Sequence, residues 1–149
     1  MSLRERAVWI TGVGVATPLG FTFGELASNL MEGRSGVGPV DRFDTTDQPC
    51  TVAACLGTIP CPEGYSPGDF EGLGPWEKVL TLTAVDALRD AGLWERRRSL
   101  RVGMVVGIGG EWVLHWEASM LKGGRGVHEP PRDRDDLTTF TRRVLGLNG

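Results

Sequence analysis

The chain has 149 residues, of which 40% are hydrophobic and 23% charged, values that are ordinary for a globular protein with a buried core and that exclude a disordered or fibrous one. Its 22 glycines and nine prolines indicate many tight turns, but they follow no fixed period that would indicate collagen or repeats. The net charge of −3 disfavours a nucleic-acid partner, and the basic cluster at residues 96–98 is too short to form a positively charged stripe.

Features that would place the chain outside the cytoplasm are weak. Arg4 and Arg6 precede an apolar run, as in a signal peptide, but Glu5, two glycines and Pro18 interrupt that segment and no clear cleavage site follows. We find no stretch that is long and apolar enough to span a membrane. The cysteines are odd in number and irregularly spaced, which favours reduced thiols: Cys50, Cys55 and Cys61. We therefore expect a cytoplasmic protein.

The stretch from Ala7 to Gly20 contains no charged residue and organises the rest of the chain. Its first four residues, 7–10, are mostly β-branched or aromatic and predict a strand covered on both faces, as in a parallel sheet. Gly12 and Gly14 are two residues apart, so they lie on the same face of an extended segment. Another backbone or a ligand can approach closely there, because glycine has no side chain.

A dinucleotide-binding fingerprint is the main rival interpretation of this stretch. That fingerprint needs a third glycine and a helix that begins directly after the second one, so that the helix N-terminus receives the pyrophosphate. Thr17 occupies the third glycine position, and Pro18 disfavours helical angles at Thr17. The sequence therefore disfavours nucleotide binding.

The next elements have local start and stop signals. Thr22 and Glu25 have the spacing of a capping box and predict a helix that ends at Gly33. Residues 41–49 are polar and turn-like. Residues 51–59 return to small and β-branched side chains, which favour a second strand or an edge hairpin.

The segment from Pro60 to Pro75 is rich in proline and glycine and predicts a long surface loop. The strongest helix follows and is expected to end at Gly92, with an apolar face made by Trp76, Val79, Leu80, Val85, Leu88 and Ala91.

The remaining elements complete an alternation of strands and helices. Residues 101–107 predict a second buried parallel strand, and residues 111–121 predict a helix after it. One more short helix is expected around residues 137–145. This order of elements indicates an α/β fold with a parallel or mixed sheet covered by helices.

Four local patterns, in order and at matching separations, resemble the N-terminal part of the elongating β-ketoacyl-acyl-carrier-protein synthases of type II systems. They are residues 8–14 with 17–20, residues 33–37, residues 42–45 and residues 87–93, and the glycine-rich stretch 107–110 extends them. The family condenses acyl thioesters with malonyl carrier protein in fatty-acid and polyketide synthesis. The resemblance therefore implies an incomplete, thiolase-like layered fold, in which residues 1–149 are the N-terminal segment of a synthase domain.

The resemblance also implies which catalytic groups belong elsewhere. In the family, a cysteine on a tight turn before a buried helix accepts the acyl chain, and two histidines and a lysine later in sequence promote decarboxylation. The chain is expected to end before the strand that delivers this cysteine, so no catalytic residue is assigned to it and the chain alone is expected to be inactive. The implied partners are an acyl carrier protein, an acyl thioester and a second ketosynthase subunit, in a homodimer or heterodimer.

Ile108, Gly109 and Gly110 are the candidate substrate-binding residues. They follow a predicted parallel strand at its carboxyl end, where open α/β sheets place ligands, and they would border an acyl tunnel in a complete enzyme. A tight turn that needs glycine for its backbone angles is the alternative. The chain departs from the family at residues 74–78 and at Glu111–Trp112, which weakens the expectation of ordinary acyl-chain binding.

The remaining cysteine and histidine residues are weak candidates for a nucleophile or a metal site. Cys55 lies in a small-residue stretch that superficially resembles a nucleophile turn, but no glycine-bounded helix start follows it. His115 and His128 match no ligand spacing with the cysteines, so neither a metal nor a cofactor is predicted. A non-catalytic ketosynthase-like binding or partner subunit remains the alternative to a piece of an active enzyme.

Overall fold

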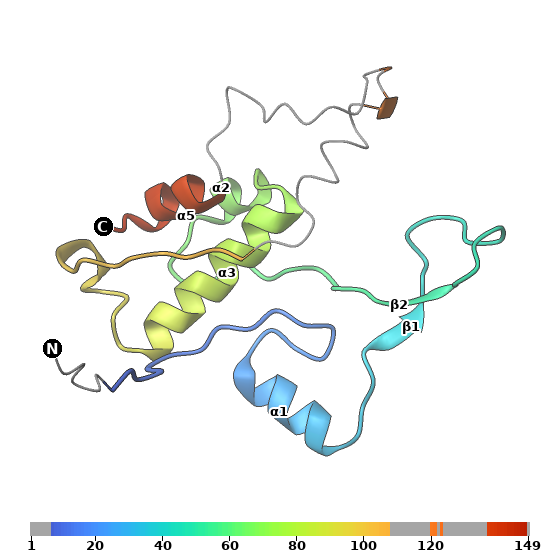
Figure 1. Cartoon of the computed structure of the whole chain (residues 1–149), viewed down its shortest axis with the longest axis horizontal. Helices are drawn as coiled ribbons and strands as arrows, with labels where there is room; N and C mark the ends of the chain where they lie inside the picture. Colours follow the sequence, from blue (N-terminus) through green and yellow to red (C-terminus); the bar gives the residue numbers. More distant parts are fainter. Residues whose placement is uncertain (1–6, 108–119, 122, 124–136, 149) are drawn as a thin grey trace, which may run out of the picture. The chain divides into compact units, whose positions relative to one another are not determined.

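The computed structural model describes residues 7–107, 120, 121, 123 and 137–148, which fall into two compact units that meet in sequence between Arg96 and Arg97 (Figure 1). The first unit contains α1 (Phe23–Met31), β1 (Val37–Pro39), β2 (Val52–Ala54), α2 (Pro67–Glu71) and α3 (Pro75–Asp90). The second contains the short 3-10 helix η1 (Arg97–Ser99) and α5 (Leu137–Leu145).

Helix α3 is the longest element and confirms the helix predicted between Pro75 and Gly92. Glu77 starts it, because its carboxylate accepts a hydrogen bond of 2.7 Å from the backbone N–H of Gly74. Gly92 ends it with a φ of 67°, and the N–H groups of Gly92 and Leu93 bind the carbonyls of Arg89 and Leu88. This is the Schellman arrangement, which needs a left-handed residue such as glycine after the helix.

Apart from Pro62, the buried residues of the first unit come from α2 and α3. Phe70 and Val85 are fully buried, and Leu82 is nearly so. The ring of Phe70 meets the ring of Tyr65 edge to face at 5.9 Å between centroids, and the ammonium of Lys78 lies 5.4 Å from its centre. Aromatic rings bury a large apolar area per side chain, so the burial of Phe70 contributes strongly to the hydrophobic stabilisation of this unit.

The expectation of a surface loop over residues 60–75 was wrong for its centre, which forms α2. The physical reason is a local helix signal inside the proline-rich segment. The Ser66 hydroxyl accepts a hydrogen bond from the N–H of Asp69, and Pro67 occupies the first helical position, where its missing N–H costs nothing. The short helix then turns Phe70 into the core.

Helix α1 confirms the predicted capping box. The Thr22 hydroxyl accepts from the N–H of Glu25 at 3.2 Å, and the Glu25 carboxylate accepts from the N–H groups of Phe21 and Thr22 at 2.9 and 3.1 Å. Gly33 ends the helix with a φ of 70°, as predicted. The hydrogen bonds from Phe21 and Thr22 favour the charged carboxylate and hold the pKa of Glu25 below its ordinary value of 4.5.

This capping box predicts a pH-dependent start of α1. Because the pKa is lower in the folded chain than in the unfolded one, the contribution of Glu25 is present above pH 4.5 and is lost as the pH falls through the lower, folded value. We expect the amide signals of Phe21 and Thr22 in NMR spectra to move with the titration of the Glu25 carboxyl. Glu25→Gln keeps an acceptor oxygen and should abolish the pH response. A Glu25 pKa at or above 4.5 would contradict this interpretation.

Strands β1 and β2 form a two-stranded antiparallel sheet in which Val37 faces Ala54, Gly38 faces Ala53 and Pro39 faces Val52. This confirms a hairpin in the region where a second strand or an edge hairpin was expected, although the strands are short. The polar residues between them make local bonds, and the Asp44 carboxylate accepts from both the N–H and the hydroxyl of Thr46.

The parallel sheet expected from residues 7–10 and 101–107 is not formed in the described residues, so that part of the prediction was wrong. Residues 7–10 belong to no strand, and the side chains of Val8, Trp9 and Ile10 are 93%, 78% and 88% exposed. In the second unit, Arg101 makes one parallel bridge to Asn148, and Val105 is 99% exposed. The apolar pattern is present, but a strand exists only when a neighbour pairs with its backbone.

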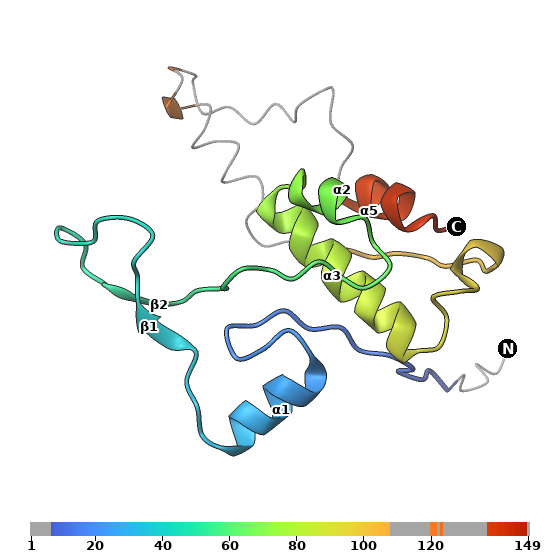
Figure 2. The ribbon, with the colours of Figure 1, turned by 180° about the vertical axis from the view of Figure 1, so that it is seen from behind.

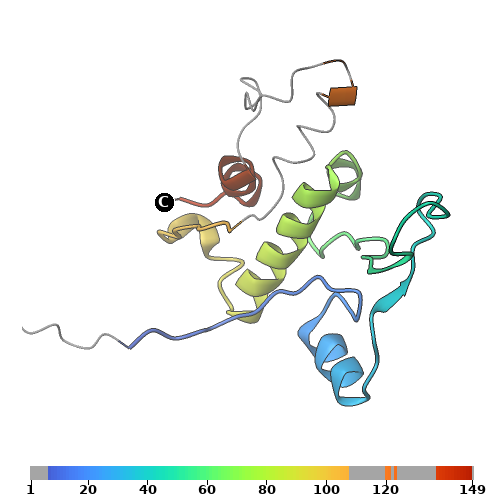
Figure 3. The same cartoon turned by 45° about the vertical axis from the view of Figure 1, so that its right-hand side comes forward.

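The glycine-rich segment instead packs against the C-terminal half of α3, where it crosses the helix (Figures 2 and 3). A Cβ atom on Gly12 would lie 2.2 Å from the Ala87 carbonyl oxygen, and one on Gly14 would lie 1.9 Å from the Thr83 carbonyl oxygen. The prediction that these glycines allow close approach is therefore confirmed, and the approaching group is the helix backbone.

Candidate functional site

The candidate substrate-binding residues Ile108, Gly109 and Gly110 lie outside the described residues, as do Glu111–Trp112 and both histidines. The assignment of an acyl tunnel to residues 108–110 therefore stays a prediction. Gly107, the last described residue before them, is exposed and has no left-handed backbone angle. Within the described part of the chain, no non-neighbouring atom lies within 4 Å of a Cβ built on it.

Three of the four sequence patterns come together in the first unit. The segment containing Gly12 and Gly14 lies on α3, which carries the fourth pattern, and the N–H of Val13 donates to the Asp90 carboxylate at 2.9 Å. A Cβ on Gly36, in the second pattern, would lie 2.7 Å from the Cβ of Pro18. The face of Gly12 and Gly14 is occupied by backbone carbonyl oxygens of α3. Carbonyl oxygens repel a phosphate, which argues against the dinucleotide-binding interpretation of this segment.

The cysteines have no arrangement that activates a thiol. Cys50 is exposed, and Cys55 and Cys61 are half-buried; all three are free thiols. Cys55 directly follows β2, and residues 56–61 contain no helix whose N-terminus could stabilise a thiolate. The thiol of Cys61 lies near the carbonyl oxygens of Pro62 and Tyr65, at 3.6 and 3.7 Å.

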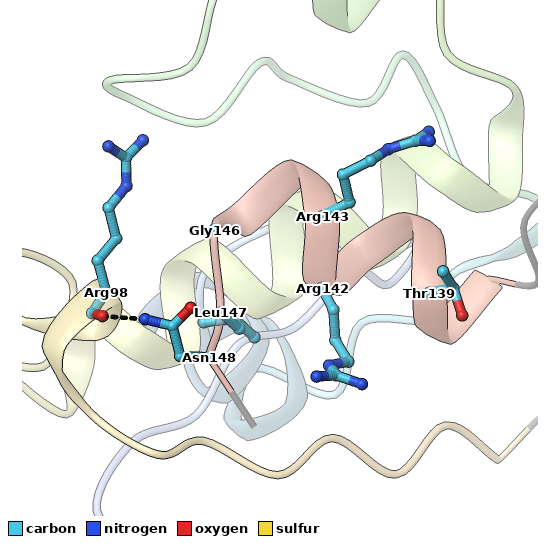
Figure 4. A pocket seen from close by; sticks show the side chains of 7 residues that line it. All are labelled: Arg98, Thr139, Arg142, Arg143, Gly146, Leu147 and Asn148. Atoms are coloured by element: carbon cyan, nitrogen blue, oxygen red, sulfur yellow. Dashed lines mark hydrogen bonds between the residues drawn. The ribbon is translucent and has the colours of Figure 1, made fainter.

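A cavity of about 500 Å³ in the second unit is lined by three arginines (Figure 4), more cationic side chains than line either of the two cavities described below. It is lined by the C-terminal part of α5 and the residues around it: Arg98, Thr139, Arg142, Arg143, Gly146, Leu147 and Asn148. Three arginines around one cavity would suit an anion if their guanidinium groups converged. Figure 4 shows these groups pointing in different directions instead.

The basic residues of this cavity have a structural explanation. Arg142 and Arg143 lie in the last turn of α5, where positive charge complements the negative end of the helix, and both take part in further interactions. Gly146 has a φ of 63° and caps the helix, and Arg97 donates from Nε to the Leu145 carbonyl at 2.8 Å. The arrangement therefore closes a helix end, and it does not present a convergent anion site.

An apolar groove of about 390 Å³ lies in the first unit between residues 56–59 and the start of α3. Its apolar lining includes Leu56, Ile59, Leu73, Trp76 and Val79. Two cations also line it, and both already have partners. Arg42 donates from Nη2 to the Leu56 carbonyl, and the Lys78 ammonium lies 3.0 Å from the Glu71 carboxylate. The groove suits an apolar group, and neither a cysteine nor a serine is among its described lining residues.

A third cavity, of about 440 Å³, lies between the start of α1 and the C-terminal half of α3. Burial raises the pKa of the Asp86 carboxyl, and the neighbouring Arg89 guanidinium partly opposes that shift. Arg89 itself pairs with Glu63 at 2.6 Å, and Asp90 holds the N–H of Val13. Arg89 and Asp90 therefore bind the segments around Glu63 and Val13 to α3.

Sequence reasoning identified neither the arginine-lined cavity nor the groove. The cluster at residues 96–98 was judged too short for a positively charged stripe, and the contacts of Arg97 and Arg98 near the end of α5 give it a role. Among the described residues, no group of three or more histidine, cysteine, aspartate or glutamate side chains could hold a metal ion. Likewise, no described helix has the length and apolar character needed to cross a membrane.

Comparison with known proteins gives consistent matches. Residues 5–132 match the family model described as "Beta-ketoacyl synthase, N-terminal domain". Over 123 residues the chain is 47% identical to 3-oxoacyl-[acyl-carrier-protein] synthase 2 of Synechocystis, which covers 80% of the chain and 30% of that protein. It is 40% identical over 86 residues to the actinorhodin polyketide putative beta-ketoacyl synthase 2 of Streptomyces coelicolor, covering 57% of the chain and 21% of that protein.

A solved structure is also similar. The ishigamide ketosynthase/chain length factor matches 93% of the chain with a TM-score of 0.59 and 25% sequence identity, and the match covers 36% of that structure's chain. The chain thus spans about a third or less of the length of these three proteins.

Proposed function

Because the chain belongs to the beta-ketoacyl synthase family through that family's N-terminal domain, we propose that it is the N-terminal portion of a 3-oxoacyl-[acyl-carrier-protein] synthase. The complete enzyme would condense an acyl thioester with malonyl carrier protein in fatty-acid or polyketide synthesis. The observation that carries this proposal is the 47% identity to the Synechocystis synthase over most of the chain.

The proposed role of this portion is to build one side of the substrate site and to support the rest of the domain. Residues 1–149 would form the N-terminal segment of the synthase domain, and Ile108, Gly109 and Gly110 would border the acyl chain. The proposed partners are an acyl carrier protein, the acyl thioester, and a second ketosynthase subunit in a homodimer or heterodimer. The proposed location is the cytoplasm, and neither nucleic acid nor membrane is a proposed partner.

The chemistry of the proposed reaction requires groups that we do not assign to these residues. Condensation needs a thiolate that accepts the acyl chain, and general acid–base groups that stabilise the carbon nucleophile. The cysteine of a condensing enzyme is activated at the start of a helix, whereas Cys55 is followed by eleven residues without one, 56–66. We therefore propose that the nucleophile and its partners come from the remainder of the synthase domain.

This proposal predicts that the isolated chain forms no stable acyl-enzyme. After incubation with an acyl carrier protein that carries an acyl thioester, intact-protein mass spectrometry should find no stoichiometric adduct, and peptide mapping should find Cys50, Cys55 and Cys61 unmodified. Iodoacetamide labelling of the exposed Cys50 serves as the positive control for detecting a modified thiol. A specific, stoichiometric acyl group on any of the three cysteines would contradict the proposal.

A non-catalytic partner subunit is the second candidate, and the similarity to a ketosynthase/chain length factor is the observation that favours it. The coding sequence downstream of residue 149 separates the two proposals. An in-frame continuation with a cysteine turn and two later histidines supports the condensing enzyme. A stop codon followed by unrelated sequence supports the binding or partner subunit.

A further inference from the structure

We draw no further inference here: the strongest candidate, the apolar groove between residues 56–59 and the start of α3, is an unpartnered apolar surface, and nothing in the described part of the chain shows what covers it.

Discussion

Replacing Gly14 by alanine is expected to detach the glycine-rich segment from α3 and to be strongly destabilising. The added Cβ would lie 1.9 Å from the carbonyl oxygen of Thr83, and a helix carbonyl cannot move aside as a flexible side chain can. Overpacking that forces the backbone to shift typically costs about 1–3 kcal/mol and occasionally more. Gly12→Ala should act in the same way, because its Cβ would lie 2.2 Å from the carbonyl oxygen of Ala87.

Urea unfolding followed by tryptophan fluorescence measures the loss of stability, and hydrogen exchange at the Val13 amide reports the segment itself. That amide donates to Asp90, so its protection should disappear in Gly14→Ala. Gly24→Ala is the matched control, because Gly24 lies in α1 and has open space around its Cβ position. The control should be neutral or stabilised by up to about 1 kcal/mol. Equal unfolding midpoints for Gly14→Ala and Gly24→Ala would contradict the close packing of the glycine-rich segment against α3.

The free chain is expected to self-associate through the apolar residues before the glycine-rich turn. Val8, Trp9 and Ile10 are almost entirely exposed, and residues 7–10 belong to no strand. Contiguous exposed apolar side chains beside unpaired backbone groups are a template for association, and a net charge of −3 opposes it only weakly. Size-exclusion chromatography should find oligomers or aggregates, and the amides of residues 8–10 should exchange rapidly.

A pair of charge substitutions localises the effect. Trp9→Lys should shift the chain toward monomer, whereas Phe43→Lys, which adds the same charge at another exposed ring in the β1–β2 connection, should not. Coexpression with the remainder of a synthase domain should also give a monodisperse species under our proposed function. A sharp monomer in which the amides of residues 8–10 and 102–106 exchange slowly would refute the expectation.

Elements with signals inside a few residues could be predicted from the sequence. The Thr22–Glu25 capping box starts α1, and Gly33 and Gly92 end α1 and α3 in left-handed conformations. These signals act through bonds between near neighbours in the chain, so no knowledge of tertiary contacts is needed. Helix α2 was missed because the prolines around it dominated the interpretation, although Ser66 and Asp69 carry the local cap.

Features that depend on distant residues could be predicted only in part. The sequence indicates that Gly12 and Gly14 admit a close neighbour, but the neighbouring carbonyls belong to residues about seventy positions later. The pattern at residues 7–10 likewise shows that these residues are apolar, but it does not identify the strand that would pair with them. No strand among the described residues pairs with them. Residues 108–110 remain a prediction for the acyl site, because they lie outside the described residues.

The most direct test of the proposed function is a chimera in which this chain replaces the matching N-terminal part of the Synechocystis synthase, to which it is 47% identical over 123 residues. Circular dichroism and a cooperative melting transition establish that the chimera folds. Our account predicts a covalent acyl thioester and a condensation rate within about tenfold of the parent enzyme, which corresponds to about 1.4 kcal/mol in activation free energy. A folded chimera that forms neither the thioester nor the β-ketoacyl product would contradict it.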